Sequence, residues 1–111
     1  MNRLAEFRGA VKKVISEYAQ YKPSLGDIEV EMVLDEVHDH YELLYIGWEG
    51  RQRVHGTVIH IDIRDGKILI HHDGTSTGVA EDLVALGIPR AQMVLGWHEP
   101  TLRKSPAYAF G

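Results

Sequence analysis

Apolar and polar residues alternate most regularly between Arg53 and Asp73, in the sequence RVHGTVIHIDIRDGKILIHHD. Alternation with a period of two is typical of a β-strand that buries one face. The run is interrupted by Asp65-Gly66, a dipeptide that favours a two-residue type I′ turn because both central residues need a positive φ. The pattern therefore predicts a long antiparallel hairpin.

The predicted turn fixes which residues face each other. Arg64 faces Lys67, and counting outward from this pair places His60 opposite His71. One face of the hairpin must be buried, because it carries Ile59, Ile61, Ile63, Ile68 and Ile70. The other face carries His60, Asp62, Arg64, Lys67 and His71. The first arm reaches about 40 Å at roughly 3.3 Å per residue. It exceeds a usual strand, so it must bend or protrude to pair with something else.

Two further strands precede the hairpin. Residues 28–35 alternate between inward apolar side chains (Ile28, Val30, Met32 and Leu34) and outward acidic ones (Glu29, Glu31 and Asp35). Residues 40–48 are apolar on both faces, which is typical of a central strand.

Two segments show the helical spacing of apolar residues. Residues 2–21 carry a continuous apolar stripe, with Asn2 as N-cap and Pro23 beyond the end. A shorter helix is predicted over 77–86, with Thr77 as its N-cap. The remaining elements are a helical turn over 89–92, a short strand or extended segment over 93–97, and an irregular tail over 98–111.

These elements predict an α+β fold in a single domain over residues 1–111. The strands form an antiparallel β-meander, since short connections make sequential strands neighbours. Its members are residues 28–35, 40–48, 53–64 and 67–73. The isoleucine face needs a cover, so we expect the N-terminal helix and the second helix to pack on it.

Composition narrows the functional classes. The chain has no cysteine, which excludes a thiol nucleophile, a thiolate zinc site and a disulfide scaffold. We see neither a secretory signal nor an apolar run long enough to span a bilayer, so we expect a cytoplasmic protein without membrane contact. The net charge of −4 argues against broad DNA binding, which depends on phosphate neutralisation.

Charge is unevenly distributed along the chain. Residues 23–50 contain eight acidic residues and no lysine or arginine. The first 22 residues carry five basic side chains against two acidic ones. These segments are either solvated surfaces of a strand and a helix, or they include an acidic surface that meets a basic partner.

The histidines raise the hypothesis of a metal site. His60, Asp62 and His71 share the polar face of the hairpin, with His72 or Asp73 near its end. Two histidines and a carboxylate on opposed strands can bind zinc or iron. No metal-binding sequence motif accompanies them, and a hydrated polar face explains them more simply. We therefore expect no bound metal and no other cofactor.

No other pattern predicts catalysis. The glycines form no phosphate-binding motif, and the serines lack a nucleophile-elbow context. Glu81 and Asp82 are adjacent on a helix, so they point in different directions and make a poor acid–base pair. His98 and Arg103 either bind an anion or anchor the tail. We expect no catalytic residue and no enzymatic activity.

Several segments, in order along nearly the whole chain, resemble the XisI family. They are YAQYKPSLGDIEV from Tyr18, DHYELL from Asp39, GW from Gly47, RVHG from Arg53, HIDIRDGKI from His60, LGIP from Leu86, VLGWH from Val94 and AFG from Ala109. The family is named for cyanobacterial factors that control excision of the fdxN element, a DNA recombination during heterocyst differentiation. The resemblance implies a small α+β accessory protein that acts beside a XisH-like protein, touches DNA only indirectly, and has no established catalytic residues.

Two alternatives remain open. The first is a metal-dependent enzyme built on His60, Asp62 and His71. The second is a factor that binds DNA directly through Arg3, Arg8, Lys12 and Lys13 of the N-terminal helix. The long hairpin arm also predicts self-association as a C₂ homodimer, because an unpaired edge favours pairing. Aromatic residues supply further apolar surface for it, namely Trp48, Trp97, Tyr108 and Phe110.

Overall fold

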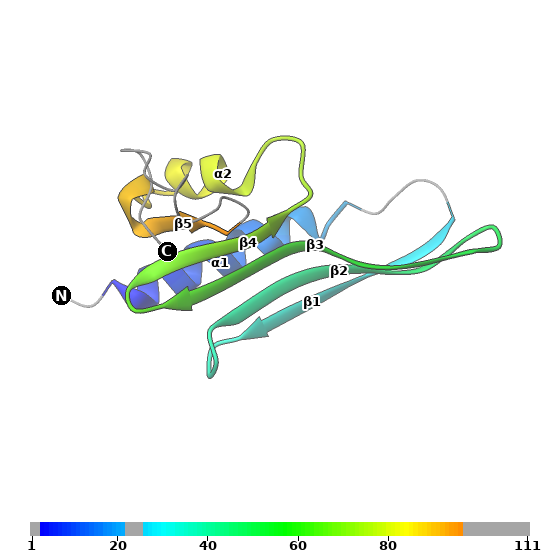
Figure 1. Cartoon of the computed structure of the whole chain (residues 1–111), viewed down its shortest axis with the longest axis horizontal. Helices are drawn as coiled ribbons and strands as arrows, with labels where there is room; N and C mark the ends of the chain where they lie inside the picture. Colours follow the sequence, from blue (N-terminus) through cyan, green and yellow to red (C-terminus); the bar gives the residue numbers. More distant parts are fainter. Residues whose placement is uncertain (1–2, 22–25, 97–111) are drawn as a thin grey trace.

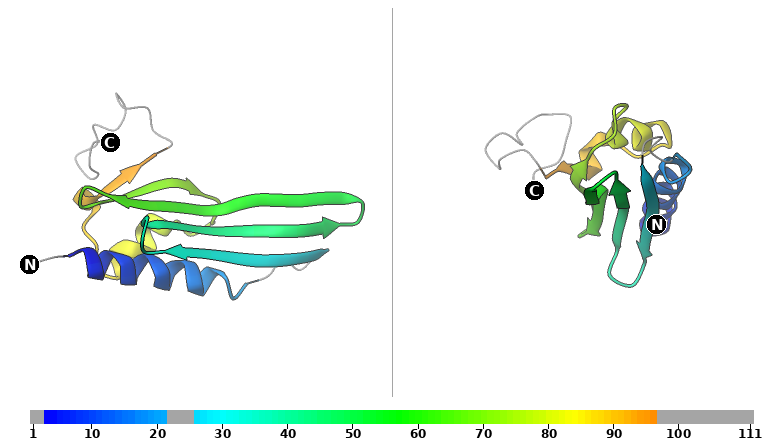
Figure 2. Two further views of the ribbon diagram at one scale, coloured as in Figure 1. Left: turned by 90° about the horizontal axis from the view of Figure 1, so that it is seen from below. Right: turned by 90° about the vertical axis from the view of Figure 1, so that its right-hand side faces the viewer.

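The computed structural model describes residues 3–21 and 26–96, which form one five-stranded sheet with two helices packed on one face (Figures 1 and 2). The elements are α1 (Leu4–Tyr18), β1 (Asp27–Asp35), β2 (His40–Glu49), β3 (Gln52–Arg64), β4 (Lys67–Asp73), α2 (Val79–Ala85), the 3₁₀ helix η1 (Arg90–Gln92) and β5 (Met93–Leu95). The strand order in the sheet follows the chain from β1 to β5.

The α+β meander that the sequence predicts is confirmed. Strands β1 to β4 pair antiparallel in sequence order, and η1 and the short β5 also form as predicted. The sheet is mixed rather than purely antiparallel, because β5 pairs parallel to β4. The chain between them passes through α2, and a helical crossover of this kind returns the chain to the sheet in the same direction.

The isoleucine face of the hairpin forms the centre of the core. All five of its isoleucines are buried, and they pack with residues of α1 and α2 such as Val11, Ile15 and Leu83. Strand β2 follows the same alternation, so Tyr41 and Leu43 are fully buried on this face. His40 and Glu42, which alternate with them along the strand, consequently point to the opposite side of the sheet.

The turn at Asp65-Gly66 forms as predicted, with φ angles of 52° and 74°. The pairs from Arg64–Lys67 to Ile61–Ile70 are confirmed. The predicted pairing of His60 with His71 is wrong, because β4 contains a β-bulge there and His60 pairs with His72. A second bulge in β3 leaves Val58 without an opposite residue in β2. A bulge adds one residue to one strand and re-aims the neighbouring side chains.

Both helices are shorter than predicted. The N-cap position of α1 falls on Arg3, which makes no capping bond through its side chain, while Asn2 lies outside the described residues. The predicted N-cap Thr77 is wrong, since α2 begins only at Val79 after Gly78. The amide of Val79 instead donates to Asp73 Oδ2 at 2.8 Å.

Strand β1 lies at an open edge of the sheet. Met32 and Leu34, predicted to point inward to the core, are 45% and 37% exposed. Only Ile28 of the predicted inward set is buried, and Val30 packs partly against the core. The edge of the sheet therefore carries apolar side chains that the helices leave uncovered.

The β2–β3 hairpin extends beyond both helices, so the long arm protrudes (Figure 1). The molecule is correspondingly elongated, with extents of 47 × 30 × 24 Å. Neither helix of the described part of the chain has the length and apolar character needed to cross a membrane.

Candidate functional site

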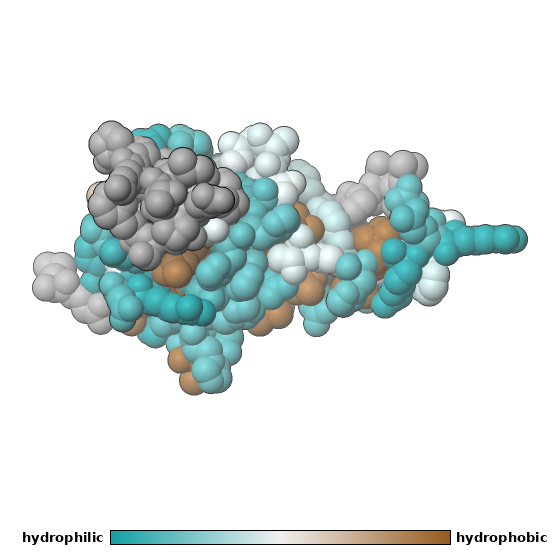
Figure 3. Space-filling model, viewed as in Figure 1, coloured by the Kyte–Doolittle hydropathy of each residue, from teal (hydrophilic) through white to brown (hydrophobic). Residues whose placement is uncertain are grey.

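A group of histidines and carboxylates lies on the open face of the sheet, opposite the helices. Strand β2 contributes His40 and Glu42, strand β3 contributes His60 and Asp62, and strand β4 contributes His71. In the register, His40 pairs with Asp62 and Glu42 pairs with His60. We call these five residues the histidine cluster. The space-filling view of this side of the molecule is mostly hydrophilic (Figure 3).

Asp62 lies at the centre of the histidine cluster and is only 6% exposed. Its Oδ1 lies 2.8 Å from His40 Nδ1 and 3.4 Å from His60 Nε2, and its Oδ2 lies 3.2 Å from His71 Nε2. Arg64 also donates to Oδ2, at 3.0 Å. Burial tends to raise the pKa of Asp62, but the hydrogen bond from His40 and the nearby histidines lower it overall. The carboxylate therefore remains charged although it is buried.

His40 bridges the two carboxylates of the histidine cluster. Its Nδ1 faces Asp62, and its Nε2 lies 3.0 Å from Glu42 Oε1. Burial alone would lower the pKa of His40, but the hydrogen bonds to Glu42 and Asp62 raise it. Both ring nitrogens donate only in the protonated imidazole, so this arrangement favours the charged form.

His60 has a different environment from His40. Its ring lies between the other two, with centroids 4.7 Å from that of His40 and 4.6 Å from that of His71. Its Nε2 is buried and has no hydrogen-bond partner among the described residues, although it lies 3.4 Å from Asp62 Oδ1. Burial lowers the pKa of His60 against the attraction of Asp62. The neutral imidazole, which can act as a ligand, is therefore favoured.

The sequence identified three members of the histidine cluster and missed two. His60, Asp62 and His71 do lie together, as the hairpin pattern suggests. His72 and Asp73, named as further candidates, are not part of it. The signal for His40 and Glu42 is their position in the strand before the hairpin, which a meander places beside β3. His98 and Arg103 lie outside the described residues.

The cations that were candidates for DNA binding are partly engaged within the molecule. Arg8 Nε donates to Asp39 Oδ1 at 2.7 Å, and Lys12 Nζ lies 2.6 Å from Glu36 Oε1. Arg3 pairs with Glu6 on its own helix. The positive side of α1 thus neutralises part of the acidic segment around the β1–β2 turn.

The acidic residues of β1 extend the open face of the sheet. Glu29 and Glu31 are exposed. Glu42 pairs with Val33 of β1, and residues paired across two strands point to the same side of the sheet. Glu29 and Glu31 lie on that side too, because they alternate with Val33 along the strand. The open face therefore combines an acidic edge on β1 with the histidine cluster on β2 to β4.

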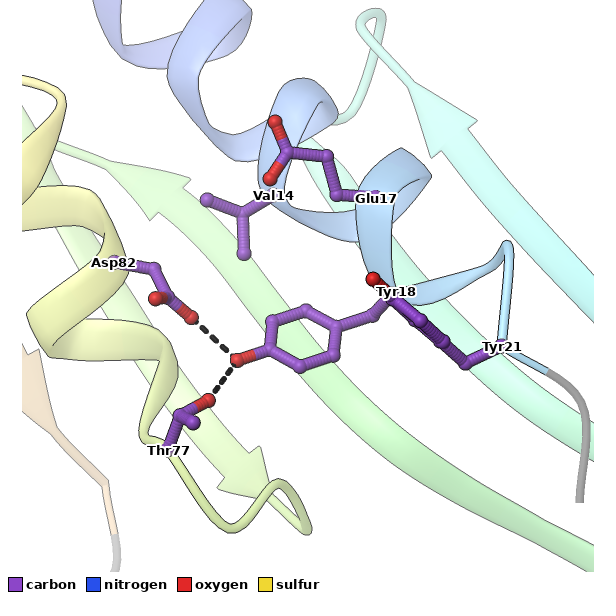
Figure 4. Close-up of a pocket in the computed structure, with 6 residues that line it drawn as sticks. All are labelled: Val14, Glu17, Tyr18, Tyr21, Thr77 and Asp82. Carbon is purple, nitrogen blue, oxygen red and sulfur yellow. Dashed lines mark hydrogen bonds between the residues drawn. The ribbon is translucent and has the colours of Figure 1, made fainter.

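A pocket of about 330 Å³ lies between the two helices (Figure 4). The hydroxyl of Tyr18 points from α1 toward α2, donates to Asp82 Oδ2 at 2.5 Å and hydrogen-bonds the hydroxyl of Thr77. Burial and the bond to Asp82 raise the pKa of Tyr18. These polar groups hydrogen-bond to one another, so the pocket lies at the contact that joins α1 to α2.

The family model of the XisI protein matches residues 1–110. The chain belongs to the XisI family. A search of curated proteins found no significant match.

Two solved structures support the XisI fold. A XisI-like protein from Anabaena variabilis is 38% identical, with a TM-score of 0.91 over 97% of this chain and 99% of that one. The fdxN element excision controlling factor XisI from Anabaena variabilis is 29% identical, with a TM-score of 0.85 over 99% of this chain and 100% of that one. Similarity over the full length of both XisI chains means that they share this sheet and its two helices.

Proposed function

We propose that this XisI-family chain is a non-catalytic accessory factor that acts by binding a XisH-like protein. The observation that carries the proposal is its similarity, over nearly the whole length of both chains, to a protein described as an fdxN element excision controlling factor. A controlling factor need not cut or join DNA itself, since it can act through the protein that does so. We also propose that the chain forms a C₂ homodimer.

The charge of the open face supports a protein partner. A protein that holds DNA carries basic surface, and opposite charges on two proteins steer their association. Glu29 and Glu31 are exposed on β1 and give it a negative surface that would attract the basic surface of such a partner. Direct DNA contact through α1 has less support, because Arg8 and Lys12 are already paired with Asp39 and Glu36.

The test is a pull-down of the XisH-like protein by the wild-type chain and by a Glu29→Lys, Glu31→Lys double variant, at low and high salt. We expect the double variant to bind more weakly, and its binding to depend less on salt, because both side chains face solvent and contribute through charge. The variant should fold normally. Glu17→Lys is the matched control, since Glu17 is an exposed acid on α1.

DNA binding by the chain alone is measured in parallel. Tight, sequence-specific binding of DNA without capture of the XisH-like protein would contradict the proposal and favour α1 as the contact surface. Equal capture by wild type and double variant at both salt concentrations would place the interface away from β1.

A further inference from the structure

Three members of the histidine cluster have the spacing of ligands around one metal ion. His60, Asp62 and His71 each offer one ligand atom, and these atoms all lie within 4.8 Å of one another. His60 Nε2 lies 3.4 Å from Asp62 Oδ1, and His71 Nε2 lies 3.2 Å from the other carboxylate oxygen, Oδ2. In a tetrahedral zinc site with bonds of about 2.0–2.1 Å, ligand atoms lie about 3.4 Å apart. The separations therefore suit an ion between the side chains.

A network of hydrogen bonds does not account for His60. Its Nε2 is the one described side-chain nitrogen or oxygen that is buried without a hydrogen-bond partner. Buried polar groups are nearly always satisfied, and an unpaired one calls for a missing partner. The nitrogen lies beside the central carboxylate, where a cation would be attracted most strongly.

We propose that His60, Asp62 and His71 bind one divalent transition-metal ion, with zinc as the first candidate. Two histidines and one carboxylate form a recognised zinc and iron ligand set, and they leave a further position open to water or another ligand. His40 would support the site from outside, because it hydrogen-bonds Asp62 and is itself held by Glu42. Such outer partners orient the ligands. The site is independent of the proposed partner-binding role.

The sequence alone favoured a hydrated face over an ion. Two features visible only in the fold change that balance. Asp62 is buried by its neighbours although neither of the two described helices packs on this face, and His40 of β2 hydrogen-bonds it. Arg64 is the competing cation at Asp62 Oδ2. Its side chain is 65% exposed, so it can move into solvent when an ion binds.

A second arrangement of ligands shares one member with the first. His40, Glu42 and His60 also bring ligand atoms within 4.8 Å of one another. In that group, however, His40 already uses both ring nitrogens in bonds to carboxylates. The two placements predict different variants to lose the ion, because Glu42 belongs only to the second and Asp62 only to the first.

The test is a calorimetric titration of Zn²⁺ into protein that has been treated with a chelator and carries no histidine tag. We expect one zinc ion per chain. His60→Ala, His71→Ala and Asp62→Asn should each lower the affinity by more than about 100-fold, beyond the roughly 10–100-fold loss typical of an outer partner such as His40→Gln. Visible absorption of bound Co²⁺ should report a four-coordinate site in wild type and be lost in His71→Ala.

His72→Ala is the matched control, because His72 is exposed and adjacent to His71 in the same strand but outside the cluster. It should bind zinc like wild type, as should His55→Ala on the projecting part of β3. Circular dichroism without metal shows that each variant is folded. Absence of saturable zinc binding at about 100 μM would overturn the proposal. So would an equal loss in His72→Ala, or a loss in Glu42→Gln with none in Asp62→Asn.

Discussion

The carboxylate of Asp39 joins the first helix to the turn between β1 and β2. Arg8 donates two hydrogen bonds to it, at 2.7 Å and 3.1 Å, and the hydroxyl of Tyr41 donates a third at 2.9 Å. The bond from Arg8 holds the pKa of Asp39 below its usual value, although burial opposes this. The residue also has a positive φ of 51°, which aspartate and asparagine tolerate better than most residues.

We expect Asp39→Asn to reduce the free energy of unfolding by about 1.5 kcal/mol at pH 7, the usual size of a charged hydrogen bond. Because the folded pKa lies below the unfolded value near 3.9, the ionised carboxylate stabilises the fold above that pH. The contribution is lost as the pH falls through the folded pKa. The difference between wild type and variant should therefore shrink below about pH 4. Urea unfolding at several pH values measures it.

Asparagine preserves the turn conformation, so any loss reports on charge rather than on backbone strain. Arg8→Gln serves as the companion variant, because it removes the donor and should show the same dependence on pH. A difference that stays constant between pH 7 and pH 3 would mean that Asp39 does not act through its charge.

At this scale the sequence predicts part of the candidate site. The Asp65-Gly66 turn is sufficient to place Asp62 on the polar face of the hairpin. The positions of His40 and Glu42 depend on the bulge at Val58. Counting back from the Glu49–Gln52 pair without a bulge would place His40 opposite Ile61, whereas the structure pairs it with Asp62. A bulge has no reliable signal in a single sequence.

Helix α2 shows how an element can begin without a cap from its own first residues. Asp73, at the end of β4, accepts hydrogen bonds from the amide and hydroxyl of Thr75 through Oδ1 and from the amide of Val79 through Oδ2. The hydroxyl of Thr77 is engaged with Tyr18 instead. Local sequence rules favour the nearest threonine as the cap. They do not identify Asp73, which lies six residues before the amide of Val79 that it caps.

Replacing Asp73 with alanine should therefore destabilise the protein by about 1–2 kcal/mol, the usual effect of losing an N-terminal cap. The loss should appear as a lower midpoint of urea unfolding without a change in slope. Asp65→Asn is the control, because Asp65 lies in the exposed hairpin turn and asparagine accepts its positive φ. If Asp73→Ala and Asp65→Asn were equally mild, the cap would not be important to the stability of α2.

For the whole molecule, the order of β1 to β4 and the buried face follow from short connections and from alternation. The parallel β5 does not, because three residues carry too little periodicity to define a strand direction. The sequence pattern also failed to predict that the β1 edge of the sheet is left uncovered. Alternation alone assigns Met32 and Leu34 to the core face, but it does not say how far the helices reach.

The exposed edge strand β1 leads us to predict that the chain forms a dimer. Met32 and Leu34 are exposed on β1, and an open edge strand is a site for pairing with another chain. We expect sedimentation at micromolar concentration to give a dimer with twice the 12.5 kDa mass of one chain. Leu34→Lys should shift the equilibrium toward monomer. Val37→Lys should not, since Val37 is 86% exposed in the turn beyond the strand. A purely monomeric wild type would contradict this expectation.

The bulge at Val58 divides β3 into two stretches with different structural roles. Residues after it pack on the helices and hold the histidine cluster, while residues before it belong to the projecting hairpin. Adding or removing a pair of residues at the hairpin tip preserves the alternation on each strand and leaves the pairs from His40–Asp62 to Leu43–Ile59 untouched. The hairpin is thus a spacer whose length evolution can adjust in two-residue steps, so the reach of the molecule can change while its body stays the same.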